Sequence, residues 1–403
     1  MFFGWYVVGG GFLAQMLVVG FFTYAVSLLV VPVRAEFGVS LEQVMYSLTV
    51  GTFAGMVVAP LAGALIDRYP MRWLMSGGVV IFAVGLLLLA NSTSITQYVV
   101  IFGLTMALTN GFAGSMATST AISRWFTSSR GKALGIAAIG TSAGGILIPA
   151  LVTYWLAETG WRGTMENLAM MALIVILPLV FLSVRGRPEE VGLLPEGASA
   201  ENPPATSGDR QLGFQDIIRN PAYWYIGLSL GALFCVYSAV LANLTPYATG
   251  LGYSAAQGST LIMALAIASF AGKLMFGFIA DKIDLKHGLW GAQLLVAVAL
   301  LILASEPGYF LILVSACLMG LATGGMLPVW GSMMARVFGL LSYGKAMGLM
   351  GPLITLSVMP GFTLIGRLYD ANGNYQLALL VFSGITMLAA ALLVPLRLAP
   401  TQG

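Results

Sequence analysis

Long apolar stretches alternate with short polar connections along almost the whole chain. We predict twelve apolar spans, at residues 5–33, 42–66, 73–91, 97–123, 131–157, 165–184, 220–248, 256–280, 286–304, 308–335, 343–367 and 374–396. An α-helix needs about 20 apolar residues to cross the hydrocarbon core of a bilayer, and these stretches are too long for the strands of a membrane barrel. Because backbone groups in hydrocarbon must be hydrogen-bonded within the protein, the pattern predicts an all-α membrane protein with twelve transmembrane helices.

The composition supports this class. Hydrophobic residues make up 59% and charged residues 8% of the 403 residues, whereas a soluble globular protein has about 25% charged residues. The first span opens a chain that is apolar throughout, so we do not interpret it as a cleaved signal peptide.

One stretch, residues 185–218, is polar and contains Pro188, Pro195, Pro203 and Pro204. It is typical of a linker between two membrane bundles. We therefore predict an N-terminal six-helix bundle at 1–184, a cytoplasmic linker at 185–218 and a C-terminal six-helix bundle at 219–403.

The two halves contain the same short motifs. Gly63-Ala-Leu-Ile-Asp67-Arg68 matches Gly277-Phe-Ile-Ala-Asp281-Lys282, and Gly131-Lys-Ala-Leu-Gly135 matches Gly344-Lys-Ala-Met-Gly348. Arg124 and Arg336 close the fourth and tenth spans, and the two members of each match are separated by nearly the same length of chain. A repeat at one nearly constant offset predicts two pseudo-symmetric bundles.

Basic residues are distributed unequally between the two sides of the predicted membrane. With a cytoplasmic N-terminus, 14 of the 18 Lys and Arg residues lie on the cytoplasmic side and three on the other, with Lys273 between them. The positive-inside rule therefore predicts an inner (cell) membrane protein with both termini in the cytoplasm. The basic residues follow this topology and form no separate patch, which argues against a nucleic-acid partner.

Parallel six-span repeats are typical of one large class of secondary transporters. The loop Gly63-x-x-x-Asp67-Arg68-x-Pro70-Met71-Arg72 resembles the motif between the second and third spans of the major facilitator superfamily, with Pro70 where glycine is usual. Further residues resemble the oxalate/formate antiporter and monocarboxylate porter branch: Gly4-Trp5, Arg124-Trp-Phe-x-x-x-Arg130-Gly-Lys-Ala-x-Gly135 and Lys273-x-x-x-Gly277-Phe278. In that branch an arginine commonly takes the place of Lys273, and an aspartate often takes the place of Ser269.

Lys273 is the residue with the clearest chemical interpretation. It lies inside an apolar span of about 25 residues, and we interpret it as the only ionisable side chain in the membrane-buried part of the chain. A charged side chain at the centre of a membrane helix costs roughly 2.5–3.5 kcal/mol on insertion scales, so such residues usually face a cavity or a ligand. Because we find no carboxylate in the spans, we expect the partner of Lys273 to be an anionic substrate.

The alternative is that Lys273 extends to the cytoplasmic surface. It lies eight residues before Asp281, which is roughly 12 Å along a helix, and a long lysine side chain covers part of that distance. A single cation in the site favours a monoanion over a dianion.

The resemblance implies that spans 1, 4, 7 and 10 line the cavity. With Lys273 and Ser269, we take as candidate substrate-binding residues Tyr24, Asn110, Tyr237, Asn243 and Trp330. Each has the alternative of a hydrogen bond between helices. That alternative is stronger for Asn243, which lies near the outer end of its span.

The resemblance also implies a cytoplasmic gate, in which charged residues hold the two halves together. Its candidate residues are Gly63, Asp67, Arg68, Arg72, Arg124, Arg130, Gly277, Asp281, Lys282 and Arg336. The simpler interpretation is charge topology and surface solvation.

We find no metal-ligand cluster, no cofactor motif, no phosphate-binding loop and no catalytic triad in the sequence, so we expect neither an enzyme nor an ATP-driven pump. We predict a carrier for small organic monoanions such as lactate or pyruvate that works as a monomer in the bilayer by proton symport or anion exchange. Two alternatives remain: a proton-coupled drug efflux antiporter, which usually holds a membrane carboxylate, and a transporter-derived sensor.

Overall fold

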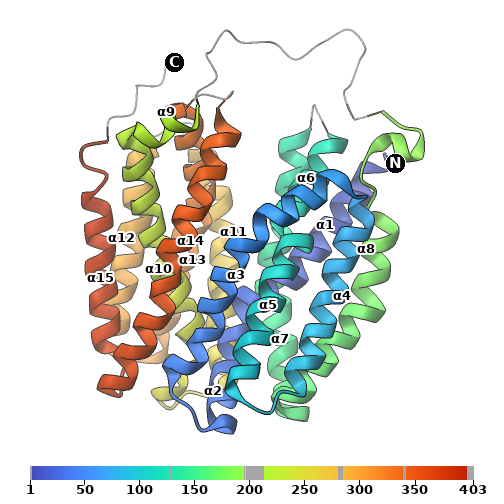
Figure 1. Ribbon diagram of the computed structural model, residues 1–403. Coiled ribbons are helices and arrows are strands. Elements are labelled where there is room, and N and C mark those ends of the chain that lie inside the picture. Colours follow the sequence, from blue (N-terminus) through green and yellow to red (C-terminus); the bar gives the residue numbers. More distant parts are fainter. Residues whose placement is uncertain are drawn as a thin grey trace. The chain divides into compact units, whose positions relative to one another are not determined.

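The computed structural model describes residues 2–126, 129–194, 196, 213–279, 285–338 and 342–396. The chain divides into two compact units, Met1–Ala205 and Thr206–Gly403, and the division falls within the polar stretch 185–218. The elements of each unit are α-helical (Figure 1), so the predicted all-α membrane fold is confirmed.

The N-terminal unit begins with a span made of three parts, α1 (Gly4–Val19), a π-helical turn (Gly20–Ala25) and α2 (Val26–Phe37). It continues with α3 (Leu41–Arg68), α4 (Met71–Ala90), and α5 (Ile95–Ala113) followed by α6 (Ser115–Trp125). The last elements are α7 (Arg130–Met171), a second π-helical turn (Ala172–Ile176), α8 (Leu177–Ser183) and a short 3-10 helix (Pro188–Val191).

The C-terminal unit begins with the short helix α9 (Phe214–Arg219). Its long helices are α10 (Pro221–Gly250), α11 (Ala255–Ile279), α12 (Leu285–Ala304), α13 (Tyr309–Phe338), α14 (Tyr343–Asn372) and α15 (Gln376–Ala391).

All twelve predicted spans coincide with helical segments. Among the described residues, nine helical stretches are long and apolar enough to cross a membrane, and two shorter apolar helices, Tyr309–Gly324 and Gln376–Ala391, lie in the tenth and twelfth predicted spans. The stretch Lys132–Ser183 holds two spans, because Gly160 has a positive φ of 67° and reverses the chain direction. Glu166 lies six residues after this turn and is exposed, and Glu42 lies in the first turn of α3. The expectation of spans without a carboxylate therefore needs a correction at these two span ends.

The internal repeat extends to the turns and helix starts. Ser40 and Gln43 form a reciprocal capping box at the start of α3. At the equivalent start of α11, Ser254 and Gln257 exchange the same two hydrogen bonds, of 2.9 and 3.2 Å. The preceding turns contain positive-φ glycines at equivalent positions, Gly38 and Gly252. Because the same caps and turns recur, the repeat is one of structure as well as sequence.

Each unit also contains a basic side chain, Arg72 or Lys286, that donates to backbone carbonyls at the end of the last span, and we call this contact the basic clasp. In the N-terminal unit, Nε of Arg72 donates to the carbonyl of Phe181 at 2.7 Å, which joins the start of α4 to α8. In the C-terminal unit, Nζ of Lys286 donates to the carbonyl of Val394 at 2.8 Å and to that of Leu396 at 3.0 Å. Cations favourably satisfy the free carbonyls at a helix C-terminus. Arg72 therefore ties α4 to α8, and Lys286 ties α12 to the chain just after α15.

Glycines allow helices to approach closely within each unit. In the N-terminal unit, a Cβ on Gly144 of α7 would clash with the carbonyl of Met16 in α1 and lie 3.0 Å from Cα of Gly20. In the C-terminal unit, a Cβ on Gly231 of α10 would lie 2.5 Å from the Ser357 hydroxyl of α14. Since lipid gives apolar helices no hydrophobic reason to associate, such close contacts supply much of the packing energy.

We predict that Gly144→Val lowers the stability of the protein, because the new side chain must push α1 and α7 apart. The expected loss is about 1–3 kcal/mol, the usual range for overpacking, measured as a fall in Tm of the detergent-purified protein. Gly135→Val is the matched control in the same helix, since a Cβ there meets nothing within 4 Å among the described residues. Equal Tm values for the two variants would contradict the packing argument.

Candidate functional site

Lys273 lies in the interior of α11, six residues before the described end of that helix at Ile279. This places its Cα roughly 9 Å from the helix end, and the residue is half-buried. Among the six long helices α10 to α15, the sequence places one carboxylate, Asp370, which is exposed near the end of α14. The unit therefore brings a cation into its membrane part and keeps its helical acid at an edge.

Close packing of α11 against α13 fixes the backbone at Lys273. A Cβ on Gly324 of α13 would clash with the carbonyl of Ser269 and lie 2.6 Å from the backbone nitrogen of Lys273. The contact is reciprocal, because a Cβ on Gly272 would clash with the carbonyl of Leu321. The two helices lie side by side (Figure 1), and a side chain on two such closely packed helices is held more precisely than one on a loop.

Two predicted site residues belong to the same helix pair. Ser269 lies one turn before Lys273 in α11, hence on the same helix face, and is 4% exposed. Trp330 lies in α13, and its ring is 6.4 Å from that of Phe234 in α10. The indole N–H of Trp330 is buried and has no hydrogen-bond partner among the described residues. Such a donor is costly in the protein alone, so it is available to an acceptor supplied by a ligand.

Tyr24 and Tyr237 occupy matching positions in the repeat of the two units. Both are buried, with 5% and 8% of their surface exposed. Tyr24 belongs to the π-helical turn Gly20–Ala25 of the first span, a local geometry that is frequent at functional sites. Hydropathy could not have indicated this turn, because it replaces an α-helical turn with no change in apolar character.

The two predicted asparagines have different surroundings. Asn110 donates from Nδ2 to the carbonyl of Met106 at 2.8 Å and lies just before the break between α5 and α6 at Gly114. Asn243 is 1% exposed, donates to the carbonyl of Ala239 at 2.9 Å and accepts from the Tyr375 hydroxyl at 3.2 Å. These bonds connect α10 to the start of α15, so Asn243 has a structural role within its unit.

The described gate residues make mostly local contacts. At the end of α6, Arg124 donates from Nη2 to the carbonyl of Ile66 in α3 at 3.3 Å, and Arg72 forms the clasp to α8. Arg68 and Arg336 are exposed, Gly63 is half-buried, and Gly277 lies in the last turns of α11. Asp281, Lys282 and the side chains of Asp67 and Arg130 lie outside the described residues.

Sequence reasoning missed two further basic residues, one in each unit. Lys286 makes the clasp of the C-terminal unit, and its signal was its place in the repeat, which corresponds to that of Arg72. The backbone carbonyl of Arg185 accepts a hydrogen bond of 2.9 Å from the indole N–H of Trp125. Burial and then the nearby Arg72 guanidinium lower the pKa of Arg185, and Glu190 opposes that shift.

Comparison with known proteins defines the family. A sequence profile described as Major Facilitator Superfamily matches residues 11–285 and 246–403. The chain therefore belongs to the Major Facilitator Superfamily and is a multi-pass membrane transport protein, not an enzyme.

Several relatives cover most of the chain at low identity. An "MFS-type transporter" of Gibberella moniliformis is 26% identical over 88% of this chain and 82% of its own length. "Monocarboxylate transporter 13" of Bos taurus is 24% identical over 98% and 89%. The "Agnestins efflux protein" of Paecilomyces divaricatus is 25% identical over 83% and 73%.

The fold also matches a solved structure. A bacterial homologue of the human lysosomal transporter Spinster, in an inward-facing and occupied conformation, has a TM-score of 0.72 at 15% identity and covers 96% of this chain and 95% of that one. At this identity the likeness shows the fold alone.

We predict that Trp330→Phe leaves the Tm unchanged or raises it. The substitution keeps an aromatic ring beside Phe234 and removes a buried donor that has no partner among the described residues, and an unmet buried donor costs about 1–3 kcal/mol. Trp290→Phe is the control, because it removes the 2.9 Å hydrogen bond from that indole to the carbonyl of Ala390 and should lower Tm. A larger fall in Tm for Trp330→Phe than for Trp290→Phe would contradict the conclusion that the Trp330 indole N–H makes no stabilising hydrogen bond.

Proposed function

We propose that this protein is a secondary active transporter of small organic monoanions, monocarboxylates such as lactate or pyruvate, and that it works by alternating access. The observation that carries the proposal is the lysine at position 273, inside a membrane helix whose backbone is packed against Gly324 of α13. A fixed cation in a membrane attracts a single carboxylate. The similarity to monocarboxylate transporters 12 and 13 supports the same substrate class.

The charge of Lys273 also supplies a reason for the loaded carrier to cross more readily than the empty one. When the site closes around the ammonium, the charge loses water at a cost of several kcal/mol, and a bound carboxylate offsets part of that cost. A preference of about 5.5 kcal/mol moves a two-state balance from 1:99 to 99:1. A bound carboxylate therefore decides most of the conformational balance.

The remaining site residues act through hydrogen bonds in this proposal. The Ser269 hydroxyl and the indole N–H of Trp330 donate to the substrate carboxylate, and Tyr237 is a further polar contact in the same unit. Tyr24 and Asn110 of the N-terminal unit stay predictions from the sequence. Asn243 contributes through its bonds to Ala239 and Tyr375, which position α10.

We further propose that the carrier is a monomer in the cell membrane with both termini in the cytoplasm. The distribution of basic residues supports this orientation. The gate residues then lie at the cytoplasmic end, where modest and breakable contacts suit a moving latch.

A second candidate function is the export of an organic metabolite. It is favoured by the relatives named as efflux proteins, for agnestins and for fujikurins, at 25% identity each. The direction of net transport then differs, while the family and the fold are the same.

We predict that Lys273→Met abolishes saturable carboxylate uptake into proteoliposomes, because it keeps the length of the side chain and removes its charge. Lys273→Arg should retain part of the activity, since the cation is preserved. Radiolabelled lactate and pyruvate uptake measures the effect, and both variants should keep a Tm close to that of the unmodified protein. Normal uptake by the methionine variant would refute the assignment of Lys273.

We predict that lactate accumulation depends on an imposed pH gradient if the anion enters with a proton. An inward proton gradient should then raise the accumulated lactate, and an ionophore that dissipates the gradient should abolish the increase. Counterflow of labelled against unlabelled lactate is the comparison measurement. Accumulation that ignores the pH gradient while counterflow persists would show exchange of one anion for another.

A further inference from the structure

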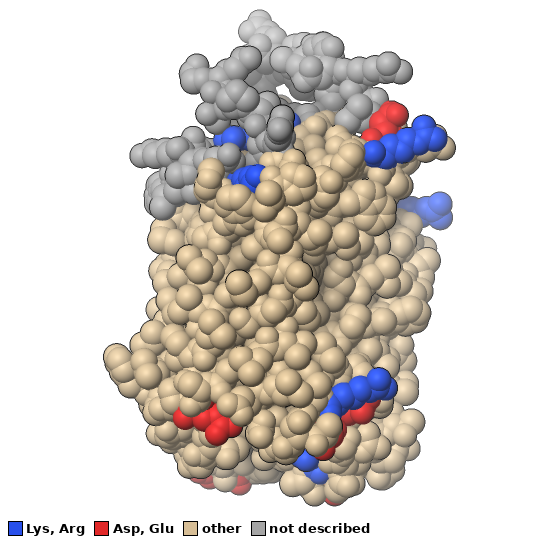
Figure 2. All heavy atoms as spheres, turned by 90° about the vertical axis from the view of Figure 1, so that its left-hand side faces the viewer, with Lys and Arg blue, Asp and Glu red and all other residues tan. Residues whose placement is uncertain are grey.

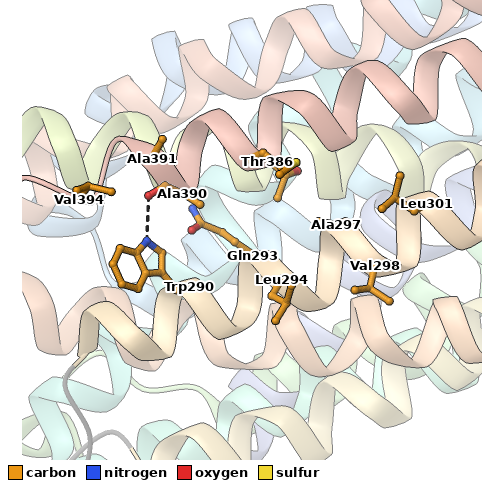
Figure 3. Close-up of a pocket in the computed structure, with 11 residues that line it drawn as sticks. Trp290, Gln293, Leu294, Ala297, Val298, Leu301, Thr386, Ala390, Ala391 and Val394 are labelled. Atoms are coloured by element: carbon orange, nitrogen blue, oxygen red, sulfur yellow. Dashed lines mark hydrogen bonds between the residues drawn. The ribbon is translucent and has the colours of Figure 1, made fainter.

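An apolar hollow lies in the C-terminal unit, and Lys273 is not among its lining residues. It is a groove of about 430 Å³ between α12 and α15, with an almost entirely apolar lining. Figure 3 shows Trp290, Gln293, Leu294 and Val298 along α12, opposite Thr386 and Ala390 of α15. The substrate site proposed above uses none of these residues.

The groove faces outward from its unit. Leu294, Met387 and Val394 are 64%, 66% and 63% exposed. The face of the molecule on the α15 side carries charged residues at its two ends and only uncharged residues between them (Figure 2). A surface of this kind is covered by lipid, so the groove opens to the hydrocarbon of the bilayer.

The dimensions of the groove fit one hydrocarbon chain. From Trp290 to Leu301 it follows α12 for eleven residues, which is about 16 Å and close to half of the roughly 30 Å hydrocarbon thickness. Its volume of about 430 Å³ and its length along one helix suit a narrow, extended apolar ligand.

Small side chains line the groove at the end of α15: Ala390 and Ala391 are its last residues, and Val394 follows it. Ala390, Ala391 and Val394 take the places that belong, in the N-terminal copy of the repeat, to Leu177, Pro178 and Phe181. In the N-terminal unit the Phe181 ring contacts Trp73 at 5.2 Å between centroids, and the Arg72 guanidinium lies 3.9 Å from the centroid of the same ring. The equivalent position in the C-terminal unit has valine instead, so no ring extends from that position toward α12.

A cation and an indole lie at one end of the groove. Nζ of Lys286 is 4.8 Å from the centroid of the Trp290 ring, and the Trp290 indole donates to the carbonyl of Ala390 at 2.9 Å. The Lys286 ammonium also donates to the carbonyl of Val394, so it is held beside the groove. Tryptophan prefers the headgroup level of a membrane, and a lysine there attracts anionic lipid by about 1 kcal/mol.

We propose that this groove binds one acyl chain of an anionic phospholipid, whose phosphate lies beside Lys286 and whose chain extends from Trp290 to Leu301. The proposal is independent of the substrate and of the direction of transport. It assigns the site to the leaflet on the Lys286 side of the membrane, which the charge distribution predicts to be the cytoplasmic one.

The test uses delipidated protein in detergent and phosphatidylglycerol with a brominated acyl chain, which quenches nearby tryptophan fluorescence. We expect saturable quenching that Trp290→Phe largely removes and that needs about fivefold more brominated phosphatidylcholine, the ratio that corresponds to about 1 kcal/mol. Ala391→Leu should remove the same quenching, because it fills the exposed end of the groove. Leu388→Phe is the matched control, since it adds bulk to the same helix outside the groove and should leave the quenching unchanged.

The Lys286→Gln variant distinguishes the contribution of the lipid headgroup to binding from that of the acyl chain. Its amide still donates to the carbonyls at the end of α15 but has no charge, so phosphatidylglycerol should lose its advantage over phosphatidylcholine. If the Ala391→Leu variant is quenched as much as the unmodified protein, the assignment of the groove as the acyl-chain site is wrong. If the unmodified protein binds the two lipids equally, the preference for an anionic headgroup is wrong. If a measurement of molecular mass finds dimers of the unmodified protein but not of the Ala391→Leu variant, the occupant of the groove is a second copy of the chain and the lipid proposal is wrong.

Discussion

Close backbone contact between helices is the constraint on which the rest of this molecule depends. Inside a bilayer, surrounding lipid is as apolar as the helix surfaces, so helices associate through tight packing and hydrogen bonds. Gly144 brings α7 onto α1, and Gly324 brings α13 onto α11 at the backbone of Lys273. The second contact gives the charged side chain a defined origin, because a helix locked against its neighbour cannot rotate the lysine toward lipid. The same packing that stabilises the unit therefore also positions its cation.

The two units share their caps, turns and basic clasps but differ in the residues that form the candidate binding sites. Capping boxes, positive-φ glycines and the clasps of Arg72 and Lys286 recur at equivalent positions of the repeat. The position that corresponds to Lys273 in the N-terminal unit is Ala59, so only one copy introduces a charge into its second helix. The apolar groove between α12 and α15 is described in the C-terminal copy, where valine takes the place of Phe181. The two copies thus share their helices and connections and differ in the residues that form the specific sites.

Sequence patterns predicted the spans well because hydrophobic length is a strong signal, and the repeat was visible in a few charged and glycine positions. The family and the all-α fold followed from the same residues. Local departures from α-helix were beyond reach: the π-helical turn that contains Tyr24 and the break at Gly114 are apolar like their surroundings. Asn243 was predicted as a substrate contact, with a hydrogen bond between helices as the stronger alternative for this residue. Its bonds to Ala239 and Tyr375 within the unit fit that alternative.

The turn at Gly252 has a mechanical consequence. Only residues 251–254 separate α10 from α11, and the turn is fixed at one side by the positive φ of Gly252 and at the other by the Ser254–Gln257 capping box. Such a connection is short and conformationally restricted, so α10 and α11 form a hairpin with little freedom at its turn. Any displacement of α11 at Lys273 is therefore expected to carry along α10, the helix that contains Tyr237.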